Sequence, residues 1–210
     1  MTLIEAVVVI AVIIILAGLL LPALAKANKS ERFNCISRMK QISLGLRMWA
    51  NDNPDHFFPW QVYGEFPNRK MHRTQDFIGS ASPLPHFLVA SNEIGNPKTL
   101  ACPKDIERLK VTRWEELTRD NISYFLNLDA QTTKPATILL GDRNLLVNGS
   151  AVKPGLALVT TNSTLGWTTN LHYLCGNIGL ADGSVQWTKN TNINQLLQAS
   201  GVATNLLVIP

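Results

Sequence analysis

The sequence predicts an α+β fold in which a long N-terminal α-helix packs on a small antiparallel β-sheet. Two observations lead to this prediction. The first 25 residues are almost entirely apolar and run without a turn signal into a helical amphipathic pattern. After residue 100 the chain changes to short apolar segments separated by Asn, Asp, Gly and Pro, which is typical of strands and turns. We therefore expect a helix over residues 1–53 and a globular α+β head domain over residues 54–210.

The apolar run over residues 1–25 contains a single charged residue, Glu5. At about 1.5 Å of rise per residue, the uncharged stretch from Ala6 to Ala25 would span about 30 Å as a helix, which is enough to cross a bilayer. A cleaved secretory signal would have a basic start and a shorter apolar core, whereas the early charge here is negative. The sequence thus predicts a retained transmembrane helix over residues 1–25.

Glu5 lies inside this apolar run, and a carboxylate in such a place is costly unless it has a partner. One interpretation is that Glu5 lies at the membrane interface, where water solvates it. The other is that Glu5 pairs with the α-amino group of another copy of the chain, so that the segment serves assembly. Further along, Pro22 removes a backbone donor, which predicts a kink or a locally unwound stretch near residues 15–23.

Residues 26–53 form the amphipathic half of the predicted helix, and we expect it to pack on the head domain. Apolar residues recur there at spacings of three and four, which places them on one helical face. These residues are Cys35, Met39, Ile42, Leu46 and Trp49. Asn51, Asp52, Asn53 and Pro54 then predict the end of the helix.

The head domain begins with residues 54–100, which have no sustained periodicity and are expected to be loops with short helices. Phe57, Phe58 and Trp60 are expected to be buried against the helix. A capping-box pattern at Thr112–Glu115 predicts a short helix ending near residue 119. Strands are expected at residues 122–128, 137–141, 156–160 and, at a sheet edge, 206–209, with a type I′ hairpin turn at Asp182–Gly183 and a helix over residues 192–200.

Charge is unevenly divided between the two parts of the chain. Residues 1–53 hold six basic and three acidic residues, while residues 54–210 hold 13 basic and 12 acidic residues. The head domain is therefore nearly neutral, and it has no clustered basic segment of the kind that nucleic-acid binding requires. This excludes nucleic acid as the primary ligand.

The N-terminal residues MTLIEAVVVIAVIIILAGLLLPALAKA resemble the mature start of type IV pilins and type II secretion pseudopilins. The resemblance implies cleavage and N-methylation by a prepilin peptidase, an inner-membrane stage, and then polymerisation by assembly machinery into an extracellular, cell-surface filament. In that family, Glu5 would neutralise the Met1 amine of a neighbouring subunit. The family usually has Phe at the first position, so Met1 is either a tolerated mature residue or follows a leader outside this numbering.

A second resemblance concerns the C-terminal half. His172, Asp182 and Gly183 reproduce the His-x9-Asp-Gly pattern of a group of pilin-like proteins found in planctomycete-type and verrucomicrobial bacteria. In the same group, a Cys precedes a Met-Lys-Gln-Ile stretch and a Cys-Pro-x-Asp motif follows, which correspond here to Cys35 and to Cys102–Asp105. The three cysteines of the chain leave three alternatives open: a Cys35–Cys102 disulfide, a Cys102–Cys175 disulfide, or no disulfide.

His172, Asp182 and Asp142 could bind a cation or, with Ser184, form a Ser-His-Asp arrangement. We favour structural roles, because Asp182 lies in a predicted turn and His172 beside the same hairpin. The sequence therefore predicts a non-enzymatic structural subunit without metal or cofactor, whose partners are other copies of the chain. A non-filament pseudopilin and a membrane-anchored cation-binding or hydrolytic domain that uses His172 and Asp182 remain as alternatives.

Overall fold

The structure is a computed structural model that describes residues 3–53, 56–61 and 81–210, with the backbone alone at residues 6 and 20–31. The chain divides into two compact units, Met1–Asn34 and Cys35–Pro210, which we call unit 1 and unit 2 and treat separately. The division falls inside the first helix, α1 (Leu3–Asn51).

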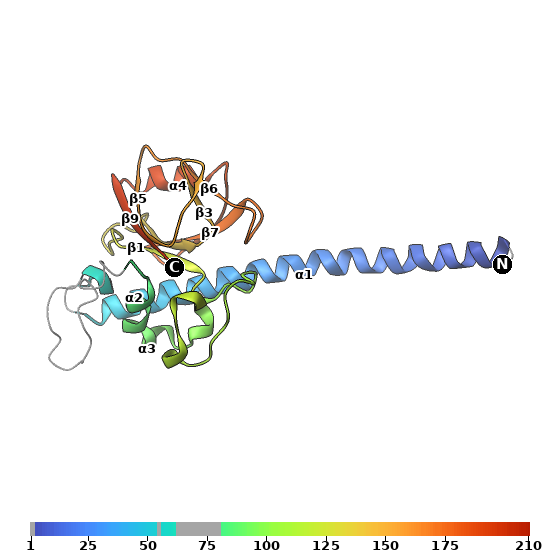
Figure 1. Cartoon of the computed structure of the whole chain (residues 1–210), viewed down its shortest axis with the longest axis horizontal. Helices are drawn as coiled ribbons and strands as arrows, with labels where there is room; N and C mark the ends of the chain where they lie inside the picture. Colours follow the sequence, from blue (N-terminus) through green and yellow to red (C-terminus); the bar gives the residue numbers. More distant parts are fainter. Residues whose placement is uncertain (1–2, 54–55, 62–80) are drawn as a thin grey trace. The chain divides into compact units, whose positions relative to one another are not determined.

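Unit 1 consists of the N-terminal part of α1 (blue in Figure 1). The helix continues through residues 15–23, so the locally unwound stretch expected around Pro22 is not present in this chain. Glu5 and the large apolar side chains described between Leu3 and Leu19 are exposed. Met1, the other residue expected to act in assembly, lies outside the described residues.

The expectation of a transmembrane helix is wrong. Within the ranges that the structure describes, no helix has the combination of length and apolar character needed to cross a lipid bilayer. The predicted membrane span over residues 1–25, and the inner-membrane precursor derived from it, are corrected by this finding.

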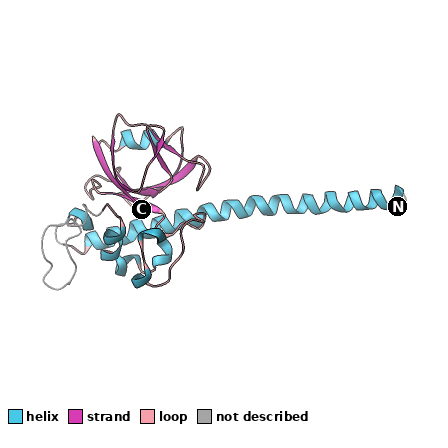
Figure 2. Ribbon diagram, viewed as in Figure 1, coloured by secondary structure: helices cyan, strands magenta, loops and turns pink. Residues whose placement is uncertain are grey.

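Unit 2 is built around two antiparallel sheets. The larger has six strands in the order β5-β9-β1-β2-β7-β8, and the smaller has three strands in the order β4-β3-β6. The strands, drawn in magenta in Figure 2, are β1 (Tyr124–Asn127), β2 (Ile138–Asp142), β3 (Leu145–Val147), β4 (Ser150–Ala151), β5 (Gly155–Thr160), β6 (Leu165–Trp167), β7 (Cys175–Leu180), β8 (Val185–Lys189) and β9 (Thr204–Ile209).

The remaining helices in the described part of unit 2 are short. They are α2 (Leu84–Val89), α3 (Ser91–Ile94) and α4 (Ile193–Ala199), together with the 3-10 turns η1 (Pro59–Gln61), η3 (Pro97–Leu100), η4 (Trp114–Glu116) and η5 (Arg119–Asn121).

The predicted fold class, a long helix on a small sheet, is therefore wrong. The described part of unit 2 is rich in sheet, with a six-stranded and a three-stranded sheet, and apart from α1 its helices have at most seven residues. The error has a physical cause: β3, β4 and β6 have three residues or fewer, and such strands are too short to give a periodic pattern.

The six-stranded sheet separates two hydrophobic cores, because successive side chains of a strand point to opposite faces. On β1, Tyr124 and Leu126 join one core and Phe125 joins the other. The first core includes the α1 stripe, which is buried as predicted (Cys35, Met39, Ile42, Leu46 and Trp49). The second core lies between the sheet, the three-stranded sheet and α4, with Trp167 fully buried in it.

A glycine lets α1 approach the larger sheet closely. A Cβ placed on Gly179 of β7 would come 2.8 Å from Leu140 Cδ2 and 3.0 Å from Ser43 Oγ of α1. The absence of a side chain at this position thus lets β7 pack closely against α1.

Several local predictions can be compared with the elements. The predicted strands at 122–128, 137–141 and 156–160 correspond to β1, β2 and β5, and the predicted C-terminal helix corresponds to α4. The predicted edge strand at 206–209 is instead the internal strand β9, between β5 and β1. Phe58 and Trp60 are buried as expected, whereas Phe57 is 41% exposed.

Two predictions of local geometry are wrong. The capping box at Thr112–Glu115 does not form, and a capping box joins Thr118 and Asn121 at the start of η5. The β7–β8 hairpin forms, but φ is positive at Gly183 alone of the Asp182–Gly183 pair, whereas a type I′ turn needs positive φ at both residues.

Candidate functional site

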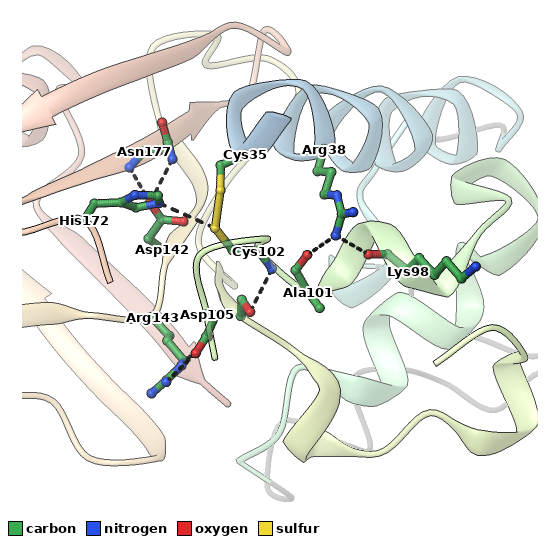
Figure 3. The surroundings of a disulfide bond; sticks show 11 residues. Cys35, Arg38, Lys98, Ala101, Cys102, Asp105, Asp142, Arg143, His172 and Asn177 are labelled. Carbon is green, nitrogen blue, oxygen red and sulfur yellow. Dashed lines mark hydrogen bonds and ion pairs between the residues drawn. A yellow bond between two sulfur atoms is a disulfide. The ribbon is translucent and has the colours of Figure 1, made fainter. Parts of the chain in front are cut away.

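The disulfide between Cys35 and Cys102 is the centre of the candidate site in unit 2 (Figure 3). It corresponds to the first of the pairings that the sequence left open. The Cα atoms are 5.5 Å apart, the cysteines are separated by 67 positions, and neither is exposed to solvent. Cys175, at the start of β7, is a free and partly buried thiol.

Two sets of contacts fix the segment that carries Cys102. Arg38 of α1 donates from Nη1 to the carbonyl oxygens of Lys98, at 2.9 Å, and of Ala101. The Cys102 backbone N–H donates to Ser123 Oγ at 2.9 Å. The segment is thereby attached to α1 on one side and to the residue preceding β1 on the other.

Asp105, the acid of the Cys-Pro-x-Asp motif, attaches the same segment to Arg143, which follows β2. Its side chain is 1% exposed and accepts two hydrogen bonds from Arg143, from Nε at 2.7 Å and from Nη2 at 2.8 Å. Such a bidentate pair combines charge with fixed geometry. The hydrogen bond from Arg143 to Asp105 is also the main reason that the pKa of Arg143 is raised.

His172 reaches the disulfide from the loop before β7. Its Nε2 lies 3.5 Å from Cys102 Sγ and 3.5 Å from Asp142 Oδ2, and its side chain is 4% exposed. The imidazole ring meets the ring of Trp187, on β8, edge-on at 5.2 Å. Figure 3 shows the ring of His172 directed at the sulfur and at Asp142.

Asp142, at the end of β2, is fully buried beside His172. Its Oδ2 accepts hydrogen bonds from the Asn177 backbone N–H at 2.6 Å and from Asn177 Nδ2 at 2.9 Å, while Oδ1 has no hydrogen-bond partner among the described residues. Burial raises the pKa of Asp142 to about 7, although the hydrogen bonds from Asn177 oppose this shift. A buried carboxyl with a raised pKa and an imidazole thus lie against a disulfide.

Asp182 and Gly183 lie elsewhere, in the turn between β7 and β8. Asp182 Oδ1 accepts a hydrogen bond from the Ser184 N–H at 2.7 Å, which is a local turn contact. Gly183 has φ of 86° and lies against Arg47 of α1, whose Nη1 donates to the Ala181 carbonyl at 3.1 Å. The hydrogen bond from Arg47 to Ala181 therefore attaches the turn to α1.

The structure thus separates the two halves of the His-x9-Asp-Gly pattern. Among the described residues, the group of potential metal ligands that come together is Cys35, Cys102 and His172, whose ligand atoms lie within 4.8 Å of one another, and Asp182 is not in it. Sequence reasoning named Asp142 as a candidate, but it missed Arg143 and Asn177. No local pattern indicates either contact, because Arg143 is 38 positions from Asp105 and Asn177 is 35 positions from Asp142.

The residues expected to act in assembly lie in unit 1. Glu5 is exposed near the start of α1, and Pro22 lies within the helix. Comparisons of the chain with protein-family models, with curated proteins and with solved structures found no match.

Proposed function

We propose that the chain is a structural subunit that polymerises with copies of itself into a pilus-like filament, and that α1 in unit 1 forms the contact between copies. The observation that carries this proposal is the exposure of large apolar side chains along the helix. Between Leu3 and Leu19 these side chains are 48% to 82% exposed. They are Leu3, Ile4, Val7, Val8, Val9, Ile10, Val12, Ile13, Ile14, Ile15, Leu16 and Leu19.

The apolar side chains surround the helix on every side. Successive residues of an α-helix are rotated by about 100°, so Val8, Ile13 and Ile14 point in three directions more than 90° apart. A helix that is apolar all round is stable when neighbours cover all of it. One partner on one face would leave most of this surface in water, which favours a bundle of several identical helices.

Burial of these side chains supplies the attraction between copies. Fully burying a Val, Leu or Ile side chain contributes about 1.5 to 3 kcal/mol, and an exposed apolar patch of this extent is typical of an interaction site. This attraction is non-directional, so it does not by itself set how far one helix is shifted along the next.

Glu5 supplies the register in this proposal. A carboxylate enclosed among apolar helices is strongly destabilising unless it is paired, and the α-amino group of a neighbouring chain would pair with it in one axial position. Shifted arrangements would leave the charge buried and uncompensated.

Replacing Glu5 tests the proposal. We expect the parent chain to form filaments visible by negative-stain electron microscopy and pelleted by ultracentrifugation, and Glu5→Ala to leave few or none. Glu115→Ala is the matched control, because Glu115 is exposed in unit 2, and it should assemble like the parent. Abundant normal filaments from Glu5→Ala, or no assembly of the parent chain, would contradict the proposal.

A further inference from the structure

Three side chains that zinc commonly takes as ligands meet at the disulfide, and the ligand atoms of Cys35, Cys102 and His172 lie within 4.8 Å of one another. We propose that, when the Cys35–Cys102 disulfide is reduced, the two cysteines and His172 bind a single Zn²⁺ ion. The ligands come from the C-terminal part of α1, the segment after η3 and the loop before β7. Two thiolates and an imidazole can serve as the three protein ligands of a tetrahedral zinc ion whose fourth ligand is water.

The distances around His172 are those that a shared tetrahedral ion requires. Zinc bonds of about 2.3 Å to sulfur and about 2.05 Å to nitrogen place those two ligand atoms about 3.5 Å apart. His172 Nε2 lies 3.5 Å from Cys102 Sγ. All three ligand atoms, Sγ of Cys35, Sγ of Cys102 and Nε2 of His172, lie within 4.8 Å of one another.

Asp142 lies beside the proposed site, although it is not one of the three grouped ligands. Its Oδ2 accepts hydrogen bonds from both donors of Asn177 and lies 3.5 Å from His172 Nε2, while Oδ1 is buried without a hydrogen-bond partner in the described part of the chain. A negative carboxylate at this distance from the His172 ligand atom would favour a cation there.

The loop that carries His172 has an unusual backbone. Tyr173 and Leu174 both have positive φ, of 50° and 58°, although neither is glycine. Such conformations cost of order 1 kcal/mol or more each and are frequent at ligand sites. Tyr173 is 76% exposed, whereas the side chain of His172 is only 4% exposed, so the loop turns His172 inward to the disulfide.

Zinc binding and the disulfide exclude each other in this proposal. A phosphine reductant and one water convert the disulfide to two thiols and phosphine oxide, with two electrons passing from phosphorus to the sulfurs. Zinc then displaces the two thiol protons, and the sulfurs move to about 3.8 Å apart on the ion. Reoxidation to the disulfide would release the zinc.

The test uses the full chain with Cys175→Ser. This substitution leaves Cys35 and Cys102 as the only two cysteines of the chain. After reduction with a phosphine, we expect about one zinc per chain by competition with a chromogenic chelator, and none for the oxidised chain. Cobalt(II) in place of zinc should give the intense absorption of tetrahedral thiolate coordination. This second readout needs no ligand variant that could fail to fold.

Variants identify the third ligand. In the reduced protein, His172→Ala should weaken zinc binding by at least about tenfold, whereas His56→Ala, at an exposed histidine, should not. Asp142→Asn removes the neighbouring negative charge and should weaken zinc binding by less than His172→Ala. Circular dichroism of the oxidised forms checks that the variants fold. Absence of zinc binding by the reduced parent, equal binding by the oxidised parent, or unchanged binding in His172→Ala would overturn the proposal.

Discussion

At the scale of single residues, the disulfide and its surroundings account for most of the motifs visible in the sequence. Helical spacing alone placed Cys35 on the buried face of α1, and the Cys-Pro-x-Asp motif marked Cys102 and Asp105. The partners of Asp105 and His172 could not be predicted in this way. Arg143 is 38 positions from Asp105, and Asn177 is 35 positions from Asp142, so tertiary pairing alone brings them together.

Removing the disulfide should destabilise unit 2. Cross-linking residues 67 positions apart restricts the unfolded chain, so Cys35→Ala with Cys102→Ala should lower the free energy of unfolding by about 2 to 4 kcal/mol in guanidinium titrations. Cys175→Ala, at the free thiol, is the control and should change it far less. Alkylation followed by intact-mass analysis should count two additional thiols after reduction; an unchanged count would contradict the disulfide.

His86 should make stability depend on pH. It is fully buried beside Trp60, both of its ring nitrogens lack hydrogen-bond partners among the described residues, and burial lowers its pKa from 6.5 to about 4. Below pH 6.5 the unfolded chain binds a proton that the folded chain does not. Stability from this group is therefore complete above pH 6.5 and falls as the pH drops toward 4, by up to about 3 kcal/mol.

Comparison with His86→Leu isolates this effect from other titrating groups. The difference in unfolding free energy between the parent chain and His86→Leu should shift in favour of the variant from pH 6.5 to 4, and then level off. The exposed His56, which has φ of 52°, offers His56→Asn as a control that should follow the parent at every pH. A difference that does not change with pH would contradict the assignment.

At the scale of elements, long periodic segments were predictable and short ones were not. The α1 stripe and α4 follow directly from apolar spacing and cap residues, because their patterns extend over several turns. The three-stranded sheet did not, because β3, β4 and β6 contain two or three residues each. The β7–β8 hairpin was predicted, but Asp-Gly is compatible with more than one turn type, and the contact of Gly183 with Arg47 belongs to tertiary structure.

The proposed role of α1 predicts sensitivity on every face of the helix in unit 1. Val8→Lys, Ile13→Lys and Ile14→Lys each place a charge in a different direction around the helix. If several copies surround α1, each variant should sharply reduce filament formation, measured as the pelleted fraction, because a buried unpaired charge is strongly destabilising.

A lysine on the surface of unit 2 provides the control. Leu109→Lys, at a side chain that is 75% exposed, should leave the pelleted fraction unchanged. If only one of the three helix variants has a reduced pelleted fraction, copies contact a single face of α1. That result would contradict the proposal that several copies surround the helix.

At the scale of the whole molecule, the sequence located the elements better than their assembly. β9, at the C-terminal end of the chain, pairs with β1 and β5 inside the larger sheet, so the sheet is complete only when distant segments meet. Local patterns contain no information about such pairings, so the order of the strands could not be predicted from the sequence. The roles proposed for the two units follow from where their apolar side chains lie. Unit 1 exposes large apolar side chains, whereas unit 2 buries its own in two hydrophobic cores.

The most direct test of the central claim is a cryo-electron microscopy structure of the filament formed by the full chain. Our account predicts that α1 residues 3–19 of several copies pack together at the filament axis, with Glu5 of one copy within hydrogen-bonding distance of the N-terminal amine of the next. A filament in which the copies contact each other through unit 2 alone, with the apolar side chains of unit 1 left in solvent, would contradict it.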